Sequence, residues 1–297
     1  MTRSNGRSRP IGAVHAFDGS ARGHFVSDVS ERYDDAAVRY RDFWGPVIAE
    51  TGLRLLDRLA PALDGRSNAS LIDVGTGLGL LALAATERWP ELRVTGIDPS
   101  SGMLAIARER IPENHHQRIS FVEGDAERIP LPDASVDVIT SAFALQLVPD
   151  RTAALREMRR VLRPGGVLAM VTWTDEAAGF EPLAIFDELA DEWDLPEDDA
   201  SYETDPFASV QSAADEVRDA GFTDVDARPD EVEHAFTAES YLALLENWER
   251  DDVFGPLEAD ELRDVRAETL DRWAGLPVDA FIWRAPVVSL LARKASR

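Results

Sequence analysis

Short apolar runs and amphipathic segments alternate along the middle of the chain. Near-continuous apolar runs, which are typical of buried strands, occupy residues 71–75, 92–98, 119–125, 135–141 and 166–173. Between them, apolar residues recur at helical spacing over 78–90, 100–111 and 151–162. This alternation of strand and helix predicts a parallel sheet that is covered by helices on both faces.

The segments before this central region follow other patterns. Residues 1–28 are rich in Arg, Ser and Gly and show no periodicity, which predicts a flexible tail. Over residues 29–69, aromatic and aliphatic side chains recur at helical spacing. Pro46 and Gly52 are expected to divide this stretch into two or three helices. We expect these helices to cap a site on the sheet.

The rhythm of strand and helix breaks after residue 173. Residues 174–205 carry many carboxylates and no Lys or Arg. An amphipathic helix is expected within them, and its apolar face carries Leu183, Phe186, Leu189 and Trp193. We expect this apolar stripe to face either the core or a ligand, with Phe186 and Trp193 as candidates for the wall of an acceptor pocket.

The remaining segments are expected to complete the sheet. The patterns predict a helix, a strand, a helical block and a final strand or hairpin over 208–221, 222–229, 238–274 and 279–294. Residues 174–297 would therefore add the last strands, with helical cap insertions at about 175–205 and 238–275.

The strand at 71–75 runs directly into Gly75, Gly77 and Gly79. A strand that ends in closely spaced glycines and opens a helix lets a ligand approach the backbone, and the helix N-terminus adds partial positive charge there. Dinucleotide-binding proteins use G-x-G-x-x-G, but Leu80 stands where the third glycine belongs. By itself the stretch is weak evidence, because a glycine-rich structural turn can give the same pattern.

Carboxylates stand at the ends of the next two strands. Asp98 follows the glycines at the spacing where an acidic residue accepts hydrogen bonds from both ribose hydroxyls of a nucleoside. Alternatively, Asp98 caps the following helix, for which Ser100 and Ser101 are also candidate N-caps. Asp125 can accept from an exocyclic adenine amine while the backbone N–H of Ala126 meets a ring nitrogen, although this pair also suits an ordinary turn. Together the three strand ends predict a nucleoside site.

These segments resemble a class I S-adenosylmethionine-dependent methyltransferase of the ubiquinone/menaquinone-biosynthesis-like (type 11) small-molecule branch. The resemblance is carried by DVGTGLG, GIDPSSGML, FVEGDAERIPLPD and REMRRVLRPGG, which begin at residues 73, 96, 121 and 156. It is specific over about 70–173 and looser over 29–69 and 206–245. It implies S-adenosyl-L-methionine as cofactor. The implied fold is a doubly wound, mostly parallel seven-stranded Rossmann-like α/β sheet with a helical cap.

The resemblance also implies which residues hold the methionine end of the cofactor. Asp73, Gly75, Thr76 and Gly77 would line the methionine moiety, and Ser141 would face its end. The stretch SAFA, which begins at Ser141, differs from the N-P-P-Y type of strand end. This difference argues against methylation of exocyclic amines in nucleic acid or of glutamine side chains.

The nucleoside end of the cofactor is assigned in the same way. The resemblance implies that Asp98 holds the ribose, that Pro99 and Met103 pack on the adenine, and that Asp125 and Ala126 read the adenine edge.

Two further positions bear on closure of the site and on catalysis. Tyr40, or alternatively Tyr33, is expected to close over the cofactor, unless these rings serve only in packing. Gln146 stands where many relatives have His, so one candidate base is missing and no catalytic residue is assigned.

Composition limits the partners of the chain. Its 297 residues carry a net charge of −24, which opposes binding to nucleic acid and to anionic membranes. No apolar run approaches the ~20 residues of a membrane span. The absence of Cys excludes thiolate chemistry, and the adjacent His115 and His116 lack the spacing of metal ligands, so no metal site is expected. The first residues lack the apolar core of a secretory signal, and we expect a cytoplasmic protein.

The sequence therefore predicts methyl transfer from S-adenosylmethionine to an O, N or C atom of a small organic acceptor. The alternative is a sensing module that binds the cofactor without transferring its methyl group. The alternative stays open because methyl transfer can proceed by proximity and alignment alone. A short-chain dehydrogenase is excluded, because it needs Tyr four residues before Lys, and the single lysine, Lys294, follows Leu at position 290.

Overall fold

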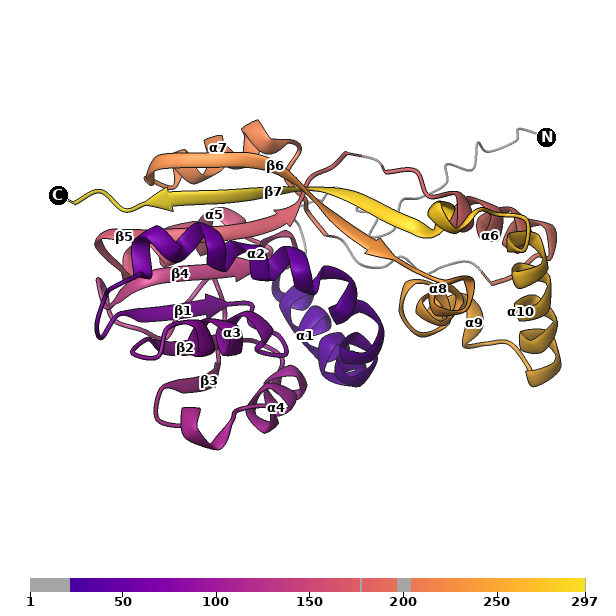
Figure 1. The fold of residues 1–297 in the computed structure, drawn as a ribbon, viewed down its shortest axis with the longest axis horizontal. Helices are drawn as coiled ribbons and strands as arrows, with labels where there is room; N and C mark the ends of the chain where they lie inside the picture. Colours follow the sequence, from indigo (N-terminus) through magenta and orange to yellow (C-terminus); the bar gives the residue numbers. More distant parts are fainter. Residues whose placement is uncertain (1–21, 177, 197–203, 297) are drawn as a thin grey trace.

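The computed structural model describes residues 22–176, 178–196 and 204–296, with side chains from residue 30 onward. Figure 1 shows a central sheet with helices packed on it and a second group of helices carried at the far end of two long strands. Within the described ranges, none of the helices combines the length and the apolar character needed to cross a membrane.

Seven strands form one sheet in the order β3-β2-β1-β4-β5-β7-β6. Their bounds are β1 (Ser70–Val74), β2 (Arg93–Asp98), β3 (Ile119–Glu123), β4 (Val136–Ala142), β5 (Leu162–Trp173), β6 (Thr223–Ala235) and β7 (Ile282–Arg293). Neighbours among β1 to β5 run parallel, whereas β7 is antiparallel to both β5 and β6. The predicted mostly parallel seven-stranded sheet is confirmed.

Successive residues of the central strands face opposite sides of the sheet. Leu71 of β1 belongs to one apolar core and Ile72 to the other. The first core also receives α2 (Gly45–Leu63), α3 (Leu80–Arg88) and α4 (Ser101–Glu109), and the second receives α5 (Arg151–Val161) and α7 (Val210–Asp219). Because both faces are covered, these strands are apolar on both sides, which is why their pattern is visible in the sequence.

The strand order reverses between β1 and β4. From β1 the chain passes through α3 to β2 and through α4 to β3, moving toward one edge of the sheet. From β4 it passes through α5 to β5, moving toward the other edge. Ligands of open α/β sheets bind outside the carboxyl ends of the strands at such a reversal. The loops after β1 and β4 therefore flank the expected binding position.

The N-terminal helices differ from the prediction in where the first helix begins and in what separates it from the next. Helix α1 (Arg22–Arg39) begins inside the predicted tail, so residues 22–28 are helical, while 1–21 lie outside the described residues. A π-helical turn, η1 (Tyr40–Trp44), joins α1 to α2. Pro46 lies in the first turn of α2, where a missing N–H costs no hydrogen bond, and Gly52 lies within α2, so neither residue breaks it.

Most of the helices after β5 form an outer group. Strands β6 and β7 extend beyond the other strands and connect to this group, as Figure 1 shows. The group comprises α6 (Glu181–Glu192), α8 (Ala238–Leu244), a π-helical turn η4 (Leu245–Glu249), α9 (Asp251–Phe254) and α10 (Ala259–Trp273).

The final segment of the chain is one strand rather than a hairpin. Strand β5 begins directly after α5, earlier than residue 166.

The apolar stripe of α6 is part of the core of this outer group. Leu183, Phe186 and Leu189 are 3%, 1% and 0% exposed, and the ring of Phe186 stacks on that of Phe254 at 5.4 Å between centroids. Trp193 follows the end of the helix and is 41% exposed. The structure therefore places Phe186 in the core rather than in the wall of an acceptor pocket, whereas a role of Trp193 in such a wall stays a prediction.

Candidate functional site

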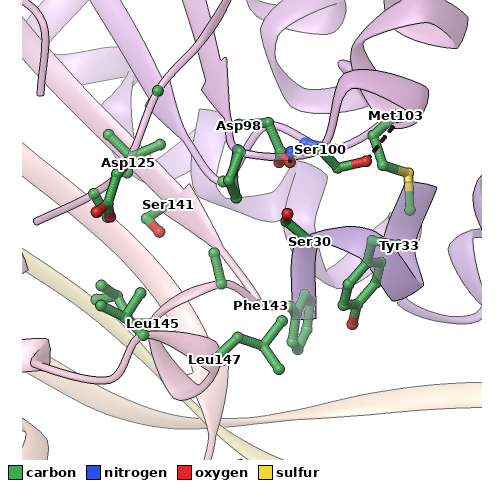
Figure 2. A pocket seen from close by; sticks show the side chains of 18 of the residues that line it. Ser30, Tyr33, Asp98, Ser100, Met103, Asp125, Ser141, Phe143, Leu145 and Leu147 are labelled. Carbon is green, nitrogen blue, oxygen red and sulfur yellow. Dashed lines mark hydrogen bonds between the residues drawn. The ribbon is translucent and has the colours of Figure 1, made fainter. Parts of the chain in front are cut away.

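A cavity of about 880 Å³, measured with its opening to solvent, lies at the carboxyl ends of β1 to β4. Figure 2 shows Asp98, Asp125 and Ser141 around one part of it, with Ser30 and Tyr33 of α1 facing them and Phe143, Leu145 and Leu147 forming an apolar wall. Its lining includes nine of the predicted site residues: Tyr40, Gly75, Gly77, Asp98, Pro99, Met103, Asp125, Ala126 and Ser141.

The two other predicted residues, Asp73 and Thr76, line a neighbouring cavity. The two cavities share Tyr40, Gly75, Gly77, Ala142 and Phe143, so they meet between the glycine loop and the end of β4. The structure therefore brings all the predicted site residues to one region of the sheet edge.

Asp98 ends β2 and is 8% exposed at the cavity. One carboxylate oxygen accepts from the backbone N–H of Gly77 at 2.7 Å, and the other accepts from that of Ser100 at 2.9 Å. An ionised carboxylate offers about four acceptor positions, so two of them stay available for ligand hydroxyls. Burial raises the pKa of Asp98 to about 6. The N-cap of α4 is Ser100, whose Oγ accepts from Met103 N, so Asp98 is not that cap.

Asp73 connects the glycine loop to β4. Its carboxylate accepts from the hydroxyl of Thr76 and from that of Thr140, both at 2.7 Å. The side chain is 2% exposed, and burial raises the pKa of Asp73 to about 6. These contacts fix the position of the loop after β1 relative to the end of β4.

The glycines of the loop differ in what surrounds them. Gly75 has φ +71°, and a Cβ built on it would overlap the Cβ of Ala144 in the loop after β4. Gly77 also has a positive φ, of +49°, but a Cβ there would meet nothing within 4 Å. Gly75 therefore permits the close approach of two loops, whereas Gly77 borders open space in both cavities.

Ser141, near the end of β4, carries an unsatisfied hydroxyl. The side chain is 1% exposed, lines the cavity, and its Oγ has no hydrogen-bond partner among the described residues. A buried polar group without a partner costs about 1–3 kcal/mol. A ligand atom that reaches Ser141 would recover this energy.

At the end of β3, one carboxylate oxygen of Asp125 accepts from the backbone N–H of Glu127 at 2.9 Å.

Sequence reasoning missed the role of Gln146, which supports the apolar wall. Phe143 has φ +54°, a backbone conformation that is rare for a bulky residue. The amide nitrogen of Gln146 donates to the carbonyl of Phe143 at 2.6 Å, and its amide oxygen accepts from the hydroxyl of Thr172 at 2.6 Å. Gln146 thus holds a strained wall residue in place. The composition of this loop gave no signal of that strain.

Helix α1 closes another side of the cavity through Ser30 and Tyr33. The rings of Tyr33 and Tyr40 lie 5.8 Å apart, and both contact Trp248 of η4, at 6.1 and 5.3 Å. Burial raises the pKa of Tyr33 to about 12 and also raises the pKa of Tyr40. Both tyrosines line the cavity and pack against a third ring. A role in closing over the cofactor and a role in packing are therefore compatible.

Comparison with known sequences finds one matching family, which is described as a methyltransferase domain and spans residues 72–170. A demethylmenaquinone methyltransferase of Deinococcus radiodurans is 41% identical over 109 residues, which are 37% of this chain and 45% of that protein. The chain thus matches less than half the length of this relative. The resemblance to type 11 methyltransferases is confirmed for this domain.

Solved structures with a similar fold extend the likeness to most of the chain. The cyclase SpnF superposes with a TM-score of 0.57 and 20% sequence identity, covering 92% of this chain and 97% of that one. Phosphoethanolamine N-methyltransferase 2 of Haemonchus contortus, solved with phosphomonomethylethanolamine and S-adenosylhomocysteine, superposes with a TM-score of 0.55 and 18% identity, covering 94% of this chain and 61% of that one. At these identities the likeness establishes the fold.

Proposed function

Because residues 72–170 form a methyltransferase domain, we propose that the chain is an S-adenosylmethionine-dependent methyltransferase that acts on a small organic molecule. The observation that carries the proposal is the buried Asp98 carboxylate, which faces the cavity beside the glycine loop with two acceptor positions available. A carboxylate at the end of the second strand, next to a glycine-rich turn, is the arrangement that recognises a ribose.

The nucleoside half of the cofactor fits the part of the cavity between β2 and β3. We assign the ribose hydroxyls to Asp98 and the edge of the adenine to Asp125 and the backbone N–H of Ala126. Pro99 and Met103, which line the same cavity, supply apolar surface for the adenine faces.

The methionine half fits the region where the two cavities meet. There the open space beside Gly77 and the unsatisfied hydroxyl of Ser141 give room and a polar partner. Asp73 and Thr76 act by holding the loop. Tyr40 lines both cavities and would lie against this half of the cofactor.

When bound, S-adenosylmethionine supplies a methyl group activated for transfer by its sulfonium. The residues of the chain bind, orient and exclude water. Tyr33, Phe143 and Leu147 surround the region with apolar surface, and Gln146 keeps the Phe143 backbone in place. Holding acceptor and methyl donor in line removes much of the entropic cost of a reaction between two molecules. We therefore place catalysis mainly in alignment.

The acceptor and the atom that receives the methyl group belong to this proposal too. The relatives and neighbours of known structure include an enzyme named for demethylmenaquinone, one named for phosphoethanolamine, and a cyclase. Fold alone therefore does not select the acceptor. The expected cytoplasmic location and the expected lack of a nucleic-acid partner stay predictions.

Methyl transfer is tested by incubating the protein with cofactor that carries a labelled methyl group and a panel of hydroquinones, amines and carboxylic acids. We expect S-adenosylhomocysteine to form only when a suitable acceptor is present, with the label recovered in that acceptor. Binding of the cofactor without transfer to any member of a broad panel would favour the alternative of a non-catalytic sensing module.

Cofactor binding should depend on pH through Asp98. Ribose hydroxyls donate to the ionised carboxylate, and the pKa of Asp98 is raised to about 6 by burial, so protonation competes with binding as the pH falls. We expect the affinity for S-adenosylhomocysteine to fall on the order of 10-fold between about pH 7.5 and pH 5. Calorimetry at several pH values measures this change.

The control is Asp98→Asn, whose affinity should be low and nearly constant over the same range of pH. This control also isolates Asp98 from Asp73, which stays intact in the variant and whose pKa is likewise about 6. A wild-type affinity that does not change over the range would contradict the assignment of Asp98 to the ribose.

A further inference from the structure

Helix α1 is attached to the start of α4 by Asp34, close to the proposed ribose site. One carboxylate oxygen of Asp34 accepts from the hydroxyl of Ser100 at 2.6 Å and from the backbone N–H of Gly102 at 2.7 Å. The other oxygen accepts from the hydroxyl of Ser101 at 3.4 Å. The two backbones come so close that a Cβ on Gly102 would lie 2.9 Å from the carbonyl oxygen of Asp34.

Ser100 links Asp34 to Asp98. Its hydroxyl donates to Asp34 and accepts from the backbone N–H of Met103 at 3.1 Å, while its own backbone N–H donates to Asp98 at 2.9 Å. Ser100 is 1% exposed, so water does not replace these partners. A single residue therefore contacts the helix that closes the cavity and the carboxylate assigned to the ribose.

The contact of Asp34 is made by an ionised group. Burial works to raise the pKa of Asp34, but the hydrogen bonds from Ser100 and Gly102 outweigh it, and the net effect lowers the pKa. Hydrogen bonds to an ionised acceptor are roughly twice as strong as those between neutral groups. Burial is the main cause of the raised pKa of Asp98, and the nearby charge of Asp34 adds to it.

The same docking of α1 builds part of the cavity. Ala37 of α1 packs with Leu78 of the glycine loop and Met103 of α4, and Ser30 and Tyr33 of α1 line the cavity. When α1 is docked, the cavity is closed on this side and Ser100 is held by Asp34.

We propose that Asp34 is a positioning residue that couples the docking of α1 to cofactor binding. It holds Ser100 so that the Ser100 N–H orients the Asp98 carboxylate toward the ribose hydroxyls. Because coupling between two equilibria is reciprocal, the bound cofactor in turn stabilises docked α1. This inference rests on the proposed function.

The first test compares Asp34→Ala with Asp35→Ala, which removes the same charge from the exposed side of the same helix. Titration with S-adenosylhomocysteine should show an affinity about 5- to 10-fold weaker for D34A and a change below about 2-fold for D35A. Equal affinities for the two variants and the wild type would overturn the inference while leaving the proposed function intact. A folded wild type that does not bind the ligand would refute the proposed function itself.

A double-mutant cycle distinguishes positioning from a general structural role. If Asp34 acts through Asp98, D34A should weaken binding by less than about 2-fold when it is introduced into Asp98→Asn. An equal loss in both backgrounds means that Asp34 only supports the fold and overturns the inference. Should D34A not fold, Asp34→Asn, which keeps one acceptor oxygen, takes its place in the same cycle.

Proteolysis of α1 gives a readout that does not depend on the measured affinity. At saturating S-adenosylhomocysteine, the wild type and D35A should both become more resistant to trypsin cleavage within residues 22–41. D34A should gain little resistance even at ligand concentrations that saturate it. Equal protection of D34A and D35A would show that α1 docking is independent of Asp34.

Discussion

Replacing Gly75 by alanine is expected to weaken binding of S-adenosylhomocysteine by at least about 100-fold. Two costs add at this position. A non-glycine residue at φ +71° costs about 1–2 kcal/mol, and the new methyl group would overlap the Cβ of Ala144. Overpacking of this kind costs about 1–3 kcal/mol or moves the backbone. Here the backbone that moves is the glycine loop, which borders both cavities.

Two further variants separate the cost of the backbone conformation from the cost of the overlap with Ala144. Gly65 has a similar φ of +74°, but a Cβ there would meet nothing within 4 Å, so Gly65→Ala should lower stability without changing affinity. Adding Ala144→Gly to Gly75→Ala removes the overlap. The affinity of this double variant should be only about 10-fold below that of the wild type. Isothermal calorimetry measures affinity and thermal unfolding measures stability. Wild-type affinity in Gly75→Ala would show that the loop does not bind the ligand.

Replacing Asp98 by alanine is the second change with a large expected effect. The carboxylate is expected to accept from both ribose hydroxyls, and hydrogen bonds to a charged group contribute about 1.5–3 kcal/mol. The affinity for S-adenosylhomocysteine should therefore fall about 10- to 100-fold. Calorimetry of Asp98→Ala beside wild type measures the difference.

Asp57→Ala is the control for loss of one negative charge. Asp57 pairs with Arg88 across the exposed surface of α2 and α3 and lines neither cavity, so its removal should leave binding unchanged. Thermal unfolding of both variants shows whether the fold is kept. An affinity of Asp98→Ala equal to that of Asp57→Ala would remove Asp98 from the site.

Much of the sheet was predictable because its strands are buried on both faces. β1 to β3 appear in the sequence as apolar runs that end in glycine or a carboxylate, the run of β4 ends at Ser141, and all four ends line the cavity. The residues at these ends could be assigned because parallel strands bring their carboxyl ends to one edge. For the same reason Asp98, Asp125 and Ser141 come together although they are distant in sequence.

The features that sequence did not predict depend on contacts between distant segments. Asp34 is an ordinary acidic residue until α1 packs on α4 and brings it to Ser100, 66 positions away. The conformation of Phe143 depends on Gln146 and Thr172, which lie in different elements. Phe186 looked available to a ligand because the pattern marks a residue as apolar without showing that Phe254 covers it.

The central claim is that the cavity over β1 to β4 binds S-adenosylmethionine. The most direct measurement is a calorimetric titration of S-adenosylhomocysteine into the folded wild-type protein. We predict saturable binding of one ligand per chain, lost in Gly75→Ala and regained in large part when Ala144→Gly is added. Absence of binding to wild-type protein that unfolds cooperatively, or equal binding by Gly75→Ala, would contradict the account.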